Sequence, residues 1–466
     1  MQILVWTHSL NTVTLYNNII CMFDLFFLNI HSFPPVLYAG TWILVTVLFF
    51  IKGQSYQRSL GGIMLVLYTL SSCVSIIFAE RINYWGISGL TVNLSKLSIS
   101  SYGFLFVCTF ICIFPFLKNA KEINNNVITI GGDFRIINYF IYFSTPFILI
   151  AFCSLLYLSI HTNPLILSDI YEDTISGSSS IFDQLGWINK KAVIYISLLS
   201  FMWPLLFFVK LLDKNSPRVA FIPLLGLLSS LLVSYTCAAR VGMVKSILYF
   251  IILLLLFKNS LSRSIFKKIT MTLFACSLVI ILLLSYITLS RFGDSKMDIL
   301  SWLSLYAGEG CMRFSEYAWN ISDTTNGDTN FSLIKSIFGF DTFTDSIERR
   351  DYYNMRLHVP THIFYTFIGD LYFDLGLVGT FIFVCLFSYT THVLIKNILL
   401  KKSISILSVF VISYIALLIV LGFTYNISKT FESQVKFVVI IIILLLINNL
   451  KIGSKNNSST KEKYTH

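Results

Sequence analysis

The chain has 466 residues, of which 56% are hydrophobic and 12% are charged, and its mean hydropathy is +0.76. A soluble domain carries about 25% charged residues, so this composition excludes a water-soluble globular protein. The formal net charge of +11 would suit a nucleic-acid-binding protein, but the basic residues are concentrated in alternate loops between apolar runs. Long apolar runs instead predict an all-α, polytopic bundle of transmembrane helices, because helices satisfy their own backbone hydrogen bonds in lipid.

Twelve spans are predicted along the chain. The first, at about 12–30, is weaker than the others because Asn17, Asn18 and Asp24 interrupt it. Eleven clear apolar runs follow, at 36–51, 60–79, 101–117, 136–160, 188–209, 219–239, 242–257, 269–290, 363–395, 403–425 and 434–450. The predicted organisation is therefore a bundle over 1–290, a large loop at 291–362, three last spans within 363–450 and a polar tail at 451–466.

The loops between these spans fall into two alternating sets that differ in basic residues. The set that begins with 52–59 and includes the C-terminal tail holds 19 Lys and Arg in 69 residues, whereas the other set holds 13 in 141 residues. Cytoplasmic loops carry the basic excess, so we expect a cytoplasmic C-terminus, and a cytoplasmic N-terminus if 12–30 spans. Anchoring near anionic lipid headgroups accounts for the charge, and no nucleic-acid partner is expected.

The loop 291–362, on the expected external side, is far longer than a connection between spans needs. It contains seven basic and ten acidic residues. In 299–320 apolar residues recur at helical spacing, and Glu309, Arg313 and Glu316 could pair along one face of that helix. The segment FSLIKSIFGF at 331–340 could lie flat at the membrane interface. We expect this loop to form a small helical lid over the bundle.

Arginines at the external side are candidate ligands for phosphate, because a guanidinium offers a rigid two-pronged donor. Arg240 lies in the tight turn between two spans, where it is either an interface anchor that reaches the headgroups or a phosphate clamp. If the long loop folds back, its arginines converge with Arg240 over one cavity; otherwise they form scattered surface ion pairs. These loop arginines are Arg291, Arg349, Arg350 and Arg356.

The stretch HVPTHIFYTFIGDLYFDLGLVG, at 358–379, places two histidines and two aspartates where the loop meets a span. His358 and His362 are either interfacial polar residues or candidates for a general base, since the pKa of histidine is near neutral. Asp370 and Asp374 share one helix face and are expected to face the bundle interior or the wall of a wet cavity. There they either pair with an arginine from a neighbouring segment or take part in catalysis.

No metal site or cofactor is predicted. The adjacent acids Glu172 and Asp173 in the external loop 161–187 could hold a divalent metal, but no second acidic cluster accompanies them, and a solvated acidic loop explains them. The sequence has no phosphate-binding loop, no nucleophile elbow and no HExxH zinc motif.

These features together resemble the O-antigen polymerases, the Wzy-type enzymes that join oligosaccharide repeat units. The resemblance is carried by eleven to twelve spans, the turn TCAARVG at 236–242, the large external loop and the run FIGDLYFDLGLVGT at 367–380. The related O-antigen ligases share this shape and carry a loop histidine, usually followed by Asn, before a GxxG-bearing span. Here Ile363 follows His362, which favours a polymerase over a ligase.

The resemblance implies an enzyme of the bacterial inner membrane that acts on its periplasmic side. A growing polysaccharide would pass en bloc from undecaprenyl pyrophosphate to a new lipid-linked repeat unit, without metal and with inversion, and a chain-length regulator is a possible partner. The expected roles are pyrophosphate clamps at Arg240 and Arg291, assistance from Arg349, Arg350 or Arg356, and a base at His358 or His362. The alternatives are a ligase, another periplasmic glycosyltransferase, or a flippase for lipid-linked oligosaccharide.

Overall fold

The described part of the chain folds mostly into helices. The β structure in the described residues is an isolated bridge between Ile130 and Ile404, which confirms the all-α class. The computed structural model describes residues 33–450, apart from 58, 86–90, 132–133, 162–180, 214–215, 238, 293–298, 344, 361–362 and 402.

The helices overlap the apolar runs of the sequence. Each of the eleven clear predicted spans coincides with one helix, or with two at 188–209, and the weaker segment 12–30 lies outside the described residues. The main helices are α2 (Phe33–Phe50), α4 (Leu60–Trp85), α5 (Ile99–Lys118), α7 (Phe134–His161), α9 (Trp187–Leu198), α10 (Met202–Leu212), α11 (Phe221–Thr236), α12 (Arg240–Phe257), α13 (Arg263–Phe292), α14 (Ile299–Glu316), α15 (Ser332–Ile337), α16 (Ser346–Leu357), α17 (Phe367–Leu399), α18 (Ile406–Leu421) and α19 (Phe431–Asn449). Short helices add α3 (Gln54–Gln57) and α6 (Ala120–Asn125).

Length and composition mark a multi-pass membrane protein. In the described part of the chain, seven helices are long and apolar enough to cross a membrane, or eight if the bent pair α9–α10 counts as one span. Two further apolar helices, at 241–257 and in α18, are shorter. A total of twelve spans stays a prediction.

The span expected at 188–209 is not one straight helix. α9 and α10 meet at an angle of 70° across a short break. Pro204 in the first turn of α10 has no amide hydrogen, and its ring would clash with the carbonyl four residues earlier if the helix continued unbroken. The break is therefore encoded locally, although the apolar run passes through it without interruption.

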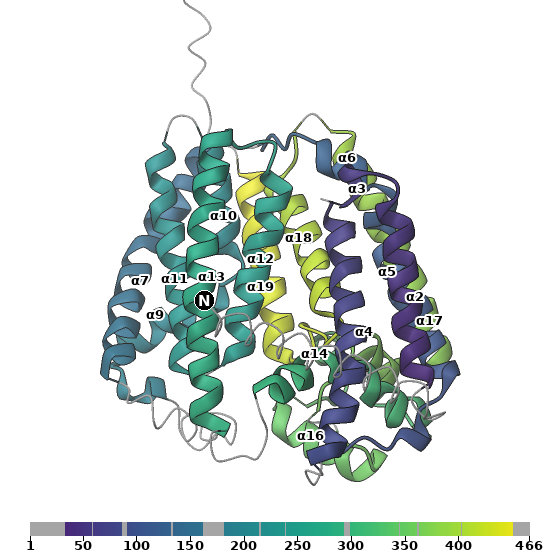
Figure 1. Cartoon of the computed structure of the whole chain (residues 1–466). Coiled ribbons are helices and arrows are strands. Elements are labelled where there is room, and N and C mark those ends of the chain that lie inside the picture. The colour runs from purple at the N-terminus through teal and green to yellow at the C-terminus, as the bar shows by residue number, and fades with distance from the viewer. Residues whose placement is uncertain are drawn as a thin grey trace, which may run out of the picture.

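The described loops of the two sets lie at opposite ends of the bundle (Figure 1). At one end α3 and α6 lie together, and the loop after α6 pairs with the loop before α18, where the Gly131 amide donates to the Ile404 carbonyl at 2.9 Å. At the other end lie α14 and α16, which belong to the long loop. The loop is thus helical, as predicted, and gathers at one end.

α14 does not cover the bundle as a lid would, but packs along α4. Small residues allow the close approach: a Cβ on Gly308 would lie 2.6 Å from the Cα of Ser75. The Ser71 hydroxyl donates to the Ala307 carbonyl at 2.6 Å. Farther along the loop, the predicted interfacial segment contains the short helix α15, whose neighbourhood exposes Ile334, Ile337, Phe338 and Phe340.

α17 is two helices joined at Gly376, rather than the single span expected at 363–395. Gly376 has φ 62° and ψ −170°, outside the helical region. Before it, the side chains at 367–374 are buried without exception, whereas the later part exposes Leu377, Val378, Phe381, Ile382 and Leu386. The first part is therefore wrapped by protein, and the apolar face that lipid could contact begins only after the kink.

This kink predicts the effect of replacing its glycine. Only glycine adopts the Gly376 conformation readily, so Gly376→Ala should destabilise the protein by about 1–3 kcal/mol through backbone strain. Its new Cβ would lie 3.7 Å from the nearest atom, so crowding adds little. Gly103→Ala in α5, where a Cβ meets nothing within 4 Å, is the matched control. Thermal unfolding of the purified protein measures both, and equal melting temperatures would contradict the strain argument.

Candidate active site

The site is built where the buried first part of α17 meets the long loop and the connection between α18 and α19. Asp370, fully buried, accepts a hydrogen bond from the Asn426 amide at 2.8 Å. The Lys429 ammonium forms an ion pair with Asp370 at 2.7 Å. Asp370 is therefore paired with a basic side chain, but the partner is a lysine from the α18–α19 connection and not the predicted arginine.

Asp374 lies one turn farther along the same face and anchors the loop through hydrogen bonds instead of an ion pair. The Thr329 and Asn330 amides donate to its carboxylate at 3.0 and 2.6 Å, and the Thr325 hydroxyl and the Asn330 side chain donate as well. The Thr325 amide also donates to the Phe373 carbonyl at 2.7 Å, near the kink of α17. A buried carboxylate with several donors fixes the loop firmly.

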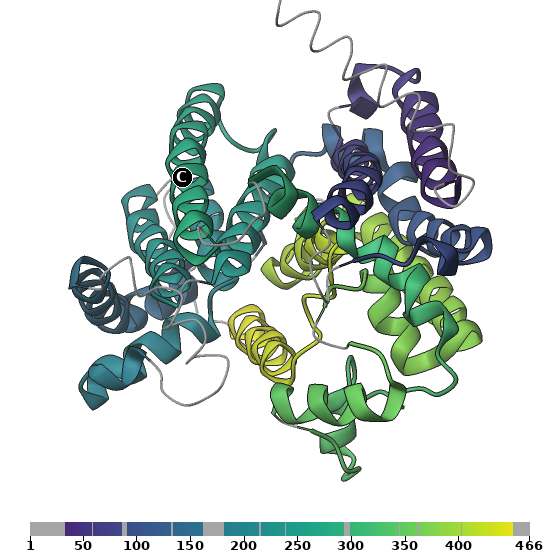
Figure 2. The ribbon, with the colours of Figure 1, turned by 60° about the horizontal axis from the view of Figure 1, so that its bottom comes forward.

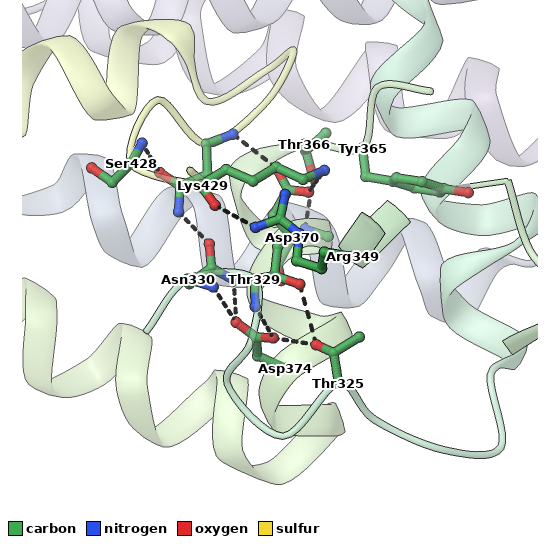
Figure 3. A network of polar contacts seen from close by, with 12 residues as sticks. Thr325, Thr329, Asn330, Arg349, Tyr365, Thr366, Asp370, Asp374, Ser428 and Lys429 are labelled. Atoms are coloured by element: carbon green, nitrogen blue, oxygen red, sulfur yellow. Dashed lines mark hydrogen bonds and ion pairs between the residues drawn. The ribbon is translucent and has the colours of Figure 1, made fainter. Parts of the chain in front are cut away.

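Asn330 joins the surroundings of the two aspartates into one network. Its side-chain amide donates to the Asp370 carbonyl at 2.7 Å and to the Asp374 carboxylate at 2.6 Å. Its side-chain oxygen accepts from the Asn426 side chain at 2.5 Å. Figure 3 shows this network between the loop, α17 and the α18–α19 connection. Three segments far apart in sequence thus hold one another in place.

Arg349, in α16, is buried and has no carboxylate partner among the residues that the structure describes. Its Nη1 donates to the main-chain carbonyls of Lys429 at 2.9 Å and Asp328 at 3.4 Å, and within the described part of the chain no carboxylate lies within ion-pair distance of it. Burial lowers the pKa of Arg349, against the opposing charges of Asp370, Asp374 and Asp328. An arginine still keeps its proton, so a positive charge with unused donors remains.

A pocket that is open to solvent lies beside this arginine. The neighbouring Arg350 also lines it, and the Tyr353 hydroxyl at its wall donates to the Asp328 carboxylate at 2.5 Å. Three basic residues with hydroxyl groups and aromatic rings around one pocket suit an anionic group. The lining residues are Thr325, Thr329, Arg349, Arg350, Tyr353, Tyr365, Phe373 and Lys429.

The other predicted residues lie outside this pocket or outside the described side chains. Arg356 pairs with Asp323 at the surface. His358 ends α16 in the left-handed conformation with an exposed side chain. Neither aspartate lines the pocket, because both are buried behind it, so their expected place on the cavity wall needs correction. Arg240 begins α12 and Arg291 lies near the end of α13, but their side chains, and all of His362, Glu172 and Asp173, lie outside the described part.

The pairing expected in α14 is confirmed. Arg313 is fully buried and forms ion pairs with Glu316 at 2.7 Å and with Glu309 at 3.3 Å. It also donates to the Thr91 carbonyl at 3.1 Å. Two acids thus share one arginine, and burial raises the pKa of Glu309 to about 7 in spite of the opposing charge of Arg313.

This pKa predicts how stability changes with pH. In the unfolded chain Glu309 has its ordinary pKa of about 4.3, so between that value and about 7 the folded protein binds more protons than the unfolded chain. The contribution of Glu309 to stability is then fully present at low pH and is lost as the pH rises toward 7. Glu309→Gln cannot titrate, so its melting temperature minus that of wild type should increase from pH 5 to pH 8. A constant difference would contradict the raised pKa.

Comparisons with known proteins assign no family. No family model, no curated protein and no solved structure matches the chain. In the described residues no group of three or more His, Cys, Asp or Glu side chains could hold a metal ion. The interpretation of the site therefore rests on its own geometry.

Proposed function

We propose that the protein polymerises lipid-linked oligosaccharide repeat units in the inner membrane of a bacterium. The observation that carries the proposal is Arg349, which is buried, has no carboxylate partner among the described residues, and lines a pocket at the end of a membrane bundle. The pyrophosphate of an undecaprenyl-linked oligosaccharide is an anion held at the membrane surface by its lipid. The cationic pocket suits the pyrophosphate of such a substrate, and the apolar spans beside it suit the lipid.

The proposed reaction displaces undecaprenyl pyrophosphate from the growing chain. The terminal sugar hydroxyl of a new lipid-linked unit attacks the anomeric carbon, a carbon–oxygen bond forms, and the bond to the donor pyrophosphate breaks with inversion. Negative charge grows on the leaving pyrophosphate, and preorganised cations are most effective where charge develops. Arg349, Arg350 and Lys429 would supply that stabilisation, so leaving-group departure needs neither a metal nor an acid.

The proton of the attacking hydroxyl requires an acceptor outside the pocket wall. The eight lining residues include no histidine and no carboxylate. His358 and His362, the predicted candidates, lie at and after the end of α16, whereas Arg349 lies in its first turn. In this proposal either histidine would approach the bound sugar from the chain that follows α16, and neither would contact the pyrophosphate.

The proposal also fixes a topology. The end of the bundle that carries the pocket would face the periplasm, and the opposite end, which contains the loops richer in basic residues, would face the cytoplasm with the C-terminus. A chain-length regulator would then contact the periplasmic end.

A lipopolysaccharide gel from a deletion strain of the source organism, with and without the gene restored, tests the proposal. Loss of polymerisation should reduce the ladder of repeat units to core plus one repeat, and the restored gene should return the ladder. Loss of even the single repeat would indicate flipping, ligation or repeat synthesis instead. An unchanged ladder would contradict a role in this polymer.

A further inference from the structure

Two lysines in apolar helices are not used by the site described above. Lys245 lies in α12 and Lys436 in α19, each five residues after its helix begins. At 1.5 Å per residue this is about 7.5 Å along the helix, near the depth of lipid headgroups if both helices begin at the membrane surface. Both lysines lie at one cluster of rings, because Lys245 lies over Phe201, Phe437 follows Lys436 in α19, and both of these rings contact Tyr414.

Their charges are only partly neutralised. Lys436 forms an ion pair with Glu432 at 2.6 Å, although the Glu432 side chain is 76% exposed. Within the described residues Lys245 has no ion pair or hydrogen bond, and its ammonium lies 5.7 Å from the centroid of the Phe201 ring. A cation at membrane depth is costly without a partner. A simple anchor that reaches for headgroups would not need a second cation opposite it.

Aromatic side chains lie between the helices that carry the two lysines. α12 and α19 both pack on α18, and the ring of Tyr414 from α18 lies 4.5 Å from Phe437 and 5.4 Å from Phe201 between ring centroids. The Tyr414 hydroxyl shares a hydrogen bond of 2.8 Å with Ser428. Apolar walls strengthen the attraction between a cation and a ligand phosphate, because the local dielectric constant is low.

One of these two lysines, Lys436, lies on α19, the helix that follows the Lys429 segment of the first pocket. Lys429, which lines that pocket, precedes Lys436 by seven residues across the start of α19. Figure 2 shows α19 between the teal helices on one side and the green and purple helices on the other.

We propose that Lys245 and Lys436 bind the pyrophosphate of a second lipid-linked oligosaccharide, the acceptor of the transfer. The proposal rests on the proposed function, because en bloc transfer requires two lipid-linked substrates at once. The donor loses its pyrophosphate and needs the strong charge compensation of the Arg349 pocket. The acceptor keeps its own pyrophosphate bond, so two lysines that hold it without stabilising a leaving group are enough.

Binding stoichiometry tests this site with the full-length protein in nanodiscs and undecaprenyl pyrophosphate as the probe. Wild type should bind two molecules per chain, the Lys245→Gln/Lys436→Gln variant one, and Arg349→Gln one. Combining the three substitutions should remove both. Lys245→Arg/Lys436→Arg should still bind two molecules, which would show that charge and not folding is responsible. The matched control is Lys267→Gln/Lys268→Gln, which changes two exposed lysines at the start of α13 and should also bind two.

The outcomes separate this proposal from the proposed function. Unchanged stoichiometry in Lys245→Gln/Lys436→Gln would overturn the second site and leave the Arg349 pocket intact. A loss there with no effect of Arg349→Gln would retain a lipid-pyrophosphate site but contradict the proposed function. Excess phosphatidylglycerol in the nanodisc distinguishes the source of the ligand: displacement of the second molecule would mean an ordinary bilayer lipid site and would overturn the acceptor assignment, whereas retention supports it.

Discussion

Arg349→Gln should abolish polymer formation while the protein remains folded in the membrane. The substitution removes a buried positive charge that faces the pocket and has no carboxylate partner among the described residues. If this charge stabilises the departing pyrophosphate, the rate should fall roughly 10²–10³-fold, as for the loss of one preorganised donor in an active site. The ladder in a complemented deletion strain and the amount of protein in the membrane fraction measure the effect.

Two further variants define what Arg349 contributes. Arg349→Lys keeps the charge but loses the planar fork, so it should recover polymer poorly. Arg218→Gln makes the same change at an exposed position at the opposite end of the bundle and should leave the ladder as in wild type. A normal ladder from Arg349→Gln at normal protein levels would remove this arginine from the site.

Asp374→Ala should loosen the loop that forms the pocket. The carboxylate accepts hydrogen bonds from the main-chain amides of Thr329 and Asn330 and from two side chains. Removing the carboxylate leaves buried donors without an acceptor, at a cost of about 1–3 kcal/mol for each donor that finds no other partner. We therefore expect the free energy of unfolding to fall by on the order of 3 kcal/mol. The melting temperature should drop by roughly 5 °C or more, and limited proteolysis should cleave the region between α14 and α17 faster than in wild type.

Asp351→Ala is the matched control, because Asp351 is exposed and pairs only with its neighbour Arg350 among the ion pairs of the described residues. Exposed pairs contribute little to stability, so its melting temperature should stay within about 1 °C of wild type. If Asp374→Ala melted at the same temperature as Asp351→Ala, the network around Asp374 would not hold the loop.

Most of the helices could be predicted from the sequence because each apolar run is long and locally encoded. The two breaks could not. The α9–α10 bend is encoded by Pro204, whose ring would clash with the carbonyl four residues earlier in a straight helix. The apolar run continues on both sides of Pro204, so hydropathy alone does not reveal the bend. Gly376 kinks α17 whereas Gly369 and Gly379 lie in helical conformation, and nothing local distinguishes these three glycines.

The site was predicted only in part, because its contacts join distant segments. Asp370 and Lys429 are 59 residues apart, and Asn330 and Asn426 are 96 apart. Lys429 is the single basic residue of its short loop. In the sequence it counted only as one of the loop charges that indicate topology, and nothing near it indicated Asp370 as its partner. The adjacent Arg349 and Arg350 were equivalent in the sequence, but the helical turn of α16 buries Arg349 and leaves Arg350 partly exposed.

The most direct test of the central claim is transfer by the purified protein in vesicles supplied with lipid-linked repeat units and a metal chelator. The account predicts products longer than one repeat, with undecaprenyl pyrophosphate released in step with each new linkage, and neither product with Arg349→Gln. Repeat units that stay single with active, folded wild-type protein, or that lengthen equally with Arg349→Gln, would contradict it.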